Sequence, residues 1–116
     1  MNIEELRDYC LSLKGATEDF PFGEFNLLLK VQGKMFGLIP LDNPESQITL
    51  KCDPERALQL RDEYEAITSA YHFNKKHWNS VRIDPSISQA LLCELIQHSY
   101  NLVVAGLPKQ LRESLD

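Results

Sequence analysis

The stretch AYHFNKKHWNSVRID, residues 70 to 84, gathers the side chains of this sequence that are best suited to chemistry or to binding. It holds two of the three histidines, two lysines, one arginine and the only tryptophan. Residues 72 to 83 carry a formal charge of +3 without any acid, in a chain whose net charge is −5. Such a cluster suits an active site, a contact with nucleic acid or a hydrated strand end, and the residues themselves leave these alternatives open.

Metal binding and catalysis find little support in the residue spacing. His72 and His77 are five residues apart, which separates them by about 140° on a helix and puts them on opposite faces of a strand. His98 falls in a predicted core helix, where a histidine is more often a hydrogen-bonded structural residue. The sequence contains no GxSxG elbow, cysteine-enzyme signature, GxGxxG motif or GxxxxGK[ST] loop. We therefore expect no enzyme activity, no cofactor and no metal.

Length and composition narrow the class of protein. With 116 residues, the chain is long enough for one core and too short for two ordinary domains, so we expect a single domain over residues 1 to 116. The net negative charge argues against a general polyanion binder, and any nucleic-acid contact must be local. Three scattered cysteines suit neither a disulfide framework nor a zinc site. Because neither a secretory signal nor a membrane span is recognisable, we expect a cytoplasmic protein without a membrane partner.

The elements that must position these residues follow from periodicity and turn signals. Helical patterns cover residues 3–14, 54–64, 86–106 and 108–116. Strand patterns cover residues 46–52 and 78–83, and a hairpin covers residues 25–40. The segment GATEDFPFGEF reads as an ordered loop whose phenylalanines tuck under the domain. The order α-β-β-β-α-β-α-α predicts an α+β fold, with helices packed on one face of an antiparallel sheet.

The hairpin sets which side chains share a face of the sheet. A two-residue turn at Gln32-Gly33 would place Val31 opposite Lys34, Leu29 opposite Phe36 and Leu27 opposite Leu38, giving one apolar face. Alternation along the strands puts Lys30, Lys51 and Arg82 on the outward face. Exposed cations on an antiparallel sheet are ordinary and discourage aggregation. Beside aromatic side chains, however, they also suit an anionic partner.

The motifs LKGA, PFG, VQGKMFGLI, LKCDPE, HFNKKHWNSVRID and SYNLV occur in this order, and their combination over nearly the whole chain resembles the MmcQ/YjbR family of small bacterial proteins. The resemblance implies a CyaY-like fold and a double-wing arrangement for DNA binding, without an established enzyme activity. By motif position it nominates Lys34, Lys51, His72, Asn74, Lys75, His77 and Trp78. Lys76 and Arg82 fill more variable positions of the motif.

The leading hypothesis is therefore weak, salt-dependent binding of DNA or RNA through a local basic sheet face. Its phosphate contacts would come from Lys34, Lys51, Lys75, Lys76 and Arg82, with Trp78 available for stacking. One alternative is a protein-interaction or regulatory module that docks an acidic protein, with Phe20, Phe22 and Phe25 adding contact area. Another is a small-ligand or metal-binding protein. For Trp78 and Asn74 a purely structural role, as a strand anchor and a turn cap, competes with a binding role.

Overall fold

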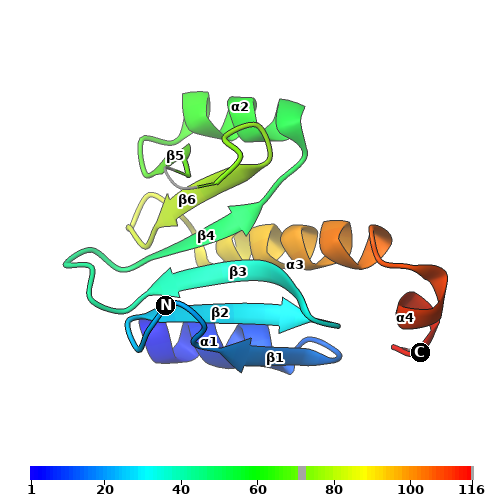
Figure 1. The fold of residues 1–116 in the computed structure, drawn as a ribbon. Helices are drawn as coiled ribbons and strands as arrows, with labels where there is room; N and C mark the ends of the chain where they lie inside the picture. The colour runs from blue at the N-terminus through cyan, green and yellow to red at the C-terminus, as the bar shows by residue number, and fades with distance from the viewer. Residues whose placement is uncertain (71–72, 116) are drawn as a thin grey trace.

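A computed structural model describes residues 1–70 and 73–115 of the chain. In this part of the chain, six strands form one open sheet in the order β1-β2-β3-β4-β6-β5, and every neighbouring pair is antiparallel. The predicted α+β class is confirmed (Figure 1). The elements are α1 (Ile3–Ser12), β1 (Ala16–Asp19), β2 (Asn26–Val31), β3 (Lys34–Pro40), β4 (Gln47–Lys51), α2 (Pro54–Glu63), β5 (Ile67–Ser69), β6 (Trp78–Arg82), α3 (Gln89–Ala105) and α4 (Lys109–Glu113).

The core lies between one face of the sheet and the helices. Alternation along each strand points Leu29, Ile48 and Val81 toward this core, and all three are buried. The helices contribute buried residues from one stripe each, including Leu6 of α1 and Ile96 of α3. Figure 1 shows α1 and α3 on the same side of the sheet, with the opposite face open toward the viewer. The residues on that open face are therefore available for contacts outside the core.

Two short edge strands, β1 and β5, were not predicted and add to the expected order of elements. In β1, the acidic residues Glu18 and Asp19 have low strand propensity, so the sequence pattern indicates a loop. Pairing with β2 overrides that preference, and two ion pairs support it, Arg7 with Glu18 and Lys30 with Asp19. The three residues of β5 are too few to give a readable alternation.

The register of the hairpin differs from the prediction because β3 contains a bulge. The turn is as expected, with positive φ at Gln32 (+49°) and Gly33 (+79°), a geometry in which glycine carries no steric cost. Val31 pairs with Lys34, but Leu29 then pairs with Gly37, so Phe36 is the extra residue. Phe36 is fully buried, and its ring meets that of Tyr100 edge-on at 5.5 Å between centroids.

The loop between β1 and β2 does not tuck under the domain. Phe20, Phe22 and Phe25 are 44%, 68% and 51% exposed, so the prediction that they are buried is wrong. The core is already filled by strand and helix residues, and Gly23 (φ +104°) lies in a turn of this loop whose amide donates to the Phe20 carbonyl. Leu41 lies beside this loop, since its backbone amide donates to the Phe25 carbonyl at 2.7 Å, and it is also exposed.

The structure also shows the state of the three cysteines and the hydrophobicity of the helices. Cys10 and Cys52 are buried and Cys93 is half-buried, and all three are free. Burial raises the pKa of Cys10 to about 12, so its thiol stays protonated at neutral pH. Within residues 1–70 and 73–115, no helix is long and apolar enough to span a membrane.

Candidate functional site

One edge of the sheet collects most of the predicted binding residues. Because neighbouring strands run antiparallel, β3 begins where β4 ends and β6 begins. Lys34, Lys51 and Trp78 stand at these three strand ends and line one hollow of about 290 Å³, together with the last turn of α3. Lys51 and Trp78 are direct cross-strand partners. We call this region, with the loop that carries Lys75 and Lys76, the basic edge.

The loop before β6 brings the other two lysines to the basic edge. Asn74 shapes this loop, because its side-chain oxygen accepts from the Lys76 amide at 3.0 Å and its carbonyl accepts from the amides of His77 and Trp78. Lys75 and Lys76 line a hollow of about 390 Å³ against α2, which also includes Glu55 and the exposed Leu58. The structure thus gives Asn74 the turn-capping role that competed with a binding role.

Two polar networks, one centred on a buried serine and one partly exposed, connect this edge to the helices. Arg61 of α2 donates from Nε to the side-chain oxygen of Asn79 at 2.8 Å and from Nη2 to the Lys75 carbonyl at 2.6 Å. Ser99 of α3 is fully buried, and its hydroxyl accepts from the Lys51 amide at 2.9 Å while donating to the Phe36 carbonyl at 2.6 Å. The backbone positions of Lys51 and Lys75 are therefore set by contacts with the two packed helices.

The candidate cations differ in whether a carboxylate neutralises them. Arg82, at the far end of β6, lies 3.2 Å from Asp84 and 4.0 Å from Glu45. Lys30, on the outward face, lies 3.0 Å from Asp19. Among the residues described, no ion pair involves any of the four lysines of the basic edge. Arg82 also stands about 13 Å along β6 from Trp78, so it is not part of this cluster.

Of the remaining motif residues, Trp78 offers an aromatic ring for contacts, and His77 contributes a backbone hydrogen bond to the sheet. Trp78 is half-buried, and its ring lies 5.5 Å from that of Phe73, tilted by 35°. The His77 carbonyl accepts from the Cys52 amide at 2.7 Å, which extends the pairing of β4 with β6. His72 lies outside the described residues. Within those residues, no group of three or more histidine, cysteine, aspartate and glutamate side chains could hold a metal ion.

His98 links α3 to the first turn of α2. Its Nε2 accepts from the Asp53 amide at 3.2 Å, and beside it Arg56 pairs with Glu94. Burial, assisted by the Arg56 charge, lowers the pKa of His98 below its ordinary value. Arg56 in turn lowers the pKa of Glu94 through a side-chain hydrogen bond. A neutral His98 therefore serves as an acceptor that holds α2 in place.

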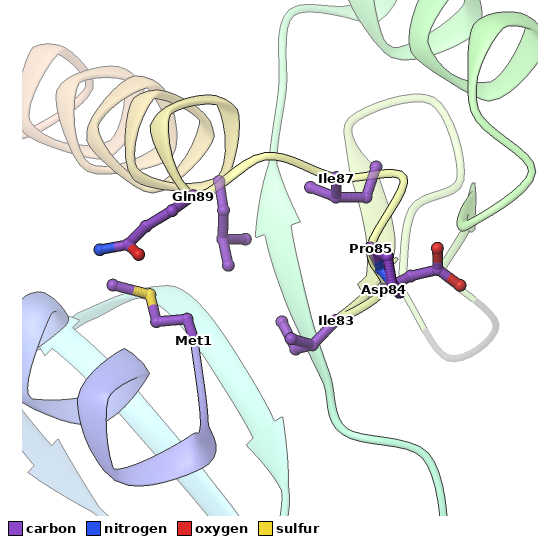
Figure 2. Close-up of a pocket in the computed structure, with 7 residues that line it drawn as sticks. Met1, Ile83, Asp84, Pro85, Ile87 and Gln89 are labelled. Atoms are coloured by element: carbon purple, nitrogen blue, oxygen red, sulfur yellow. The ribbon is translucent and has the colours of Figure 1, made fainter.

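A separate cavity lies at the opposite side of the fold, where α1 and α3 begin. It measures about 290 Å³ and is lined mainly by apolar side chains, including Met1, Ile83 and Leu92. Figure 2 shows the Met1 side chain extending toward Gln89, whereas the Asp84 carboxylate points away from Met1. Asp84 is engaged by the Ser86 amide at 2.8 Å and by Arg82, and these contacts lower its pKa. This cavity brings together none of the predicted binding residues.

The sequence pattern alone did not identify Arg61 and Ser99, which position the basic edge. A serine on the apolar stripe of α3 was a usable signal, because a buried hydroxyl in a core helix needs a partner. Arg61 gave no such signal, since an arginine in the last turn of a helix is ordinary.

Known proteins resemble this chain in both sequence and fold. The protein YbdF of Escherichia coli O157:H7 is 44% identical over 107 residues, which cover 92% of this chain and 88% of that protein. YjbR of Escherichia coli strain K12 is 30% identical over 115 residues, covering 99% and 98% of the two chains. Both are described as uncharacterised proteins.

The crystal structure of Deinococcus radiodurans protein DR2400 superimposes with a TM-score of 0.91 at 36% identity, over 98% of this chain and 87% of that one. A crystal structure of a Pseudomonas syringae protein gives a TM-score of 0.76 at 26% identity, over 88% and 98% of the two chains. The model of the YjbR family matches residues 11–102. This chain belongs to the YjbR family.

Proposed function

We propose that this protein binds nucleic acid through phosphate contacts at the basic edge. The observation that carries the proposal is a set of four lysines without an ion pair to any described carboxylate. Lys34 and Lys51 line one hollow with Trp78, and Lys75 and Lys76, in the loop just before Trp78, line a second hollow. Lysine ammonium groups pair with phosphates as point charges, and an adjacent aromatic ring offers a surface for stacking. The acidic surface elsewhere keeps the interaction local and weak.

The lysines of the hollow beside α3 also have a structural use. The last turn of α3 has no basic residue of its own, and Lys34 and Lys51 line the same hollow as that turn. Cations near a helix C-terminus are stabilising, by about 0.3–1 kcal/mol each. The hollow of Lys75 and Lys76 includes Arg61 from the last turn of α2, so that helix end already has a cation of its own. Lys75 and Lys76 are therefore the more specific indicators of an anionic partner.

A salt titration tests the proposal. With up to four phosphates neutralised, the logarithm of the association constant should fall with the logarithm of salt concentration, with a slope of about −4 for duplex DNA and about −3 for a single strand. Fluorescence anisotropy of labelled 20-nucleotide DNA and RNA measures this slope. Absence of binding at low salt would reject the proposal, and stronger binding of poly-glutamate at the same lysines would instead favour an acidic protein as the partner.

A second candidate function belongs to the opposite edge. Phe20, Phe22, Phe25 and Leu41 form an exposed apolar surface, which we call the phenylalanine edge. Large exposed aromatic clusters mark interaction sites more often than ordinary surface. Its surroundings include the exposed acids Glu24 and Asp42. Charge complementarity therefore favours a partner that is apolar at its centre and basic at its rim.

Amphipathic peptides test this second function. A leucine–lysine helical peptide should bind the wild-type protein and lose that binding in the Phe22→Ser, Phe25→Ser variant. A leucine–glutamate peptide of the same length is the matched control. Equal binding of both peptides, or of neither, would argue against a docking surface for a basic partner.

A further inference from the structure

The open face of the sheet contains a hollow of about 310 Å³ that is lined by none of the predicted binding residues. We call it the sheet hollow. Its lining includes Asn26, Leu38, Gln47, Thr49, Phe73 and Ser80. Leu38 pairs with Thr49, and Thr49 pairs with Ser80, so three adjacent strands form its floor. Although no described helix covers this face, Thr49 is only 4% exposed, which indicates a recessed floor.

The lining indicates the chemistry of an occupant. It consists of amide, hydroxyl and apolar side chains and contains no charged residue within the described part of the chain. A charged group entering this hollow would lose water without gaining an opposite charge, which is unfavourable. Amides and hydroxyls can both donate and accept hydrogen bonds, and the Phe73 ring offers an aromatic surface. These groups together suit an uncharged, planar group with hydrogen-bonding edges.

The position of the sheet hollow relates it to the basic edge. Thr49 and Lys51 are two residues apart on β4, and Ser80 and Trp78 are two residues apart on β6, so each pair shares the open face at a spacing of about 7 Å. Phe73 lines the sheet hollow, Trp78 lines the hollow beside α3, and the two rings are 5.5 Å apart. A ligand could therefore place an uncharged part against Phe73 and an anionic part at Lys51.

We infer that the sheet hollow accepts one unpaired nucleobase of a single-stranded nucleic acid whose phosphates contact the basic edge. This inference rests on the proposed function and deepens it. Ligand pockets commonly measure about 300–1,000 Å³, so a hollow at the lower end of that range fits one base rather than several. A base within a duplex keeps its edges paired and stacked and cannot enter. Asn and Gln side chains such as Gln47 can pair with the edge of a base, and stacking on Phe73 tolerates any base.

Oligonucleotides with and without bases test this inference. The probes are a labelled decathymidylate and an abasic sugar-phosphate decamer of equal charge, titrated against the full chain at low salt. The base-containing strand should bind about 5-fold to 150-fold more tightly, the range expected for one stacked base. Trp78 is the only tryptophan, so quenching of its fluorescence by the decathymidylate, and not by the abasic strand, provides a second readout.

Variants separate the sheet hollow from the lysines. Phe73→Ala and, independently, Gln47→Ala should reduce the preference for the base-containing strand while leaving abasic binding unchanged. Phe22→Ala, which removes an exposed ring at the other edge, is the matched control and should change neither. Equal binding of both strands by the wild-type protein would overturn the inference and leave phosphate binding intact, whereas binding of neither strand would reject the proposed function itself.

Discussion

The basic edge and the phenylalanine edge stand at opposite ends of the same strands but are built differently. At the basic edge, the four lysines have no ion pair among the described residues, while hydrogen bonds with Ser99 and Arg61 fix the backbone at Lys51 and Lys75. At the other ends of the strands, Asp84 neutralises the cation Arg82 of β6, and the phenylalanine edge exposes aromatic rings on a loop. The number of cations on a sheet face is therefore a poor guide to its charge, because their ion-pair partners decide which of them can contact an anion.

The largest expected effect comes from removing the unpaired lysines. Lys75→Gln combined with Lys76→Gln should weaken oligonucleotide binding at low salt about tenfold or more and make the salt slope shallower by about 2. The matched control is Lys30→Gln combined with Arg82→Gln, which changes the net charge equally but at cations that already have partners. Equal losses in the two double variants, measured by anisotropy, would mean that only net charge matters.

The next largest effect is a loss of stability when the hydrogen bonds of Ser99 to the backbone at Lys51 and Phe36 are removed. Ser99→Ala leaves the Lys51 amide and the Phe36 carbonyl without their partner, and an unsatisfied buried group costs about 1–3 kcal/mol. We expect the free energy of unfolding in urea to fall by about that amount. Ser88→Ala, which removes a solvent-exposed helix cap, is a control with an expected loss of about 1 kcal/mol. A loss for Ser99→Ala no larger than for this control would show that the buried bonds are not a principal support.

The sequence predicted most of the fold and part of the candidate site. Periodicity gave the three longest helices and the four central strands, because each buries a stripe or a face long enough to be read. It missed β1 and β5, whose residues become strands only through pairing with a neighbour, and it missed the bulge at Phe36. For the candidate site, strand alternation predicted the outward position of Lys51, and the family motif nominated Lys75 as a binding residue. Neither could reveal that Asp84 pairs with Arg82, since such pairing depends on side-chain geometry.

A smaller effect is expected from the turn that presents the two lysines. Asn74→Ala removes the acceptor for the Lys76 amide, and we expect the free energy of unfolding to fall by about 0.5–1.5 kcal/mol. Asn74→Asp retains an acceptor oxygen at the same place and should restore most of the stability, while its charge beside the lysines should still weaken oligonucleotide binding. Full loss of stability in Asn74→Asp, measured in urea, would exclude the proposed role of the side chain in the turn.

The smallest effect is a dependence of stability on pH near the basic edge. The folded state lowers the pKa of His98 below its ordinary value of 6.5, so the unfolded chain takes up a proton first as the pH falls. This contribution to stability is complete above about pH 6.5 and is lost progressively as the pH falls from there toward the folded-state pKa. The charges of Arg56, Glu94 and Asp53 beside the ring also act on this pKa, Arg56 lowering it and the two carboxylates raising it.

Urea titrations at pH 7.5 and 5.5 measure this dependence. His98→Gln keeps an acceptor for the Asp53 amide but does not titrate, so the variant should lose less stability than the wild-type protein on acidification. The difference between the two proteins cancels the contributions of the other histidines. An identical loss in both would show that His98 does not hold α2 in the way its contacts suggest.

We expect that anions contact the basic edge and not the phenylalanine edge. Backbone amide chemical shifts, recorded by NMR while a decathymidylate is added at low salt, test it residue by residue. We expect shifts at Lys34, Lys51 and residues 73–78, with residues 20–24 unchanged. Shifts at residues 20–24, or none at any lysine while the oligonucleotide binds, would contradict this expectation.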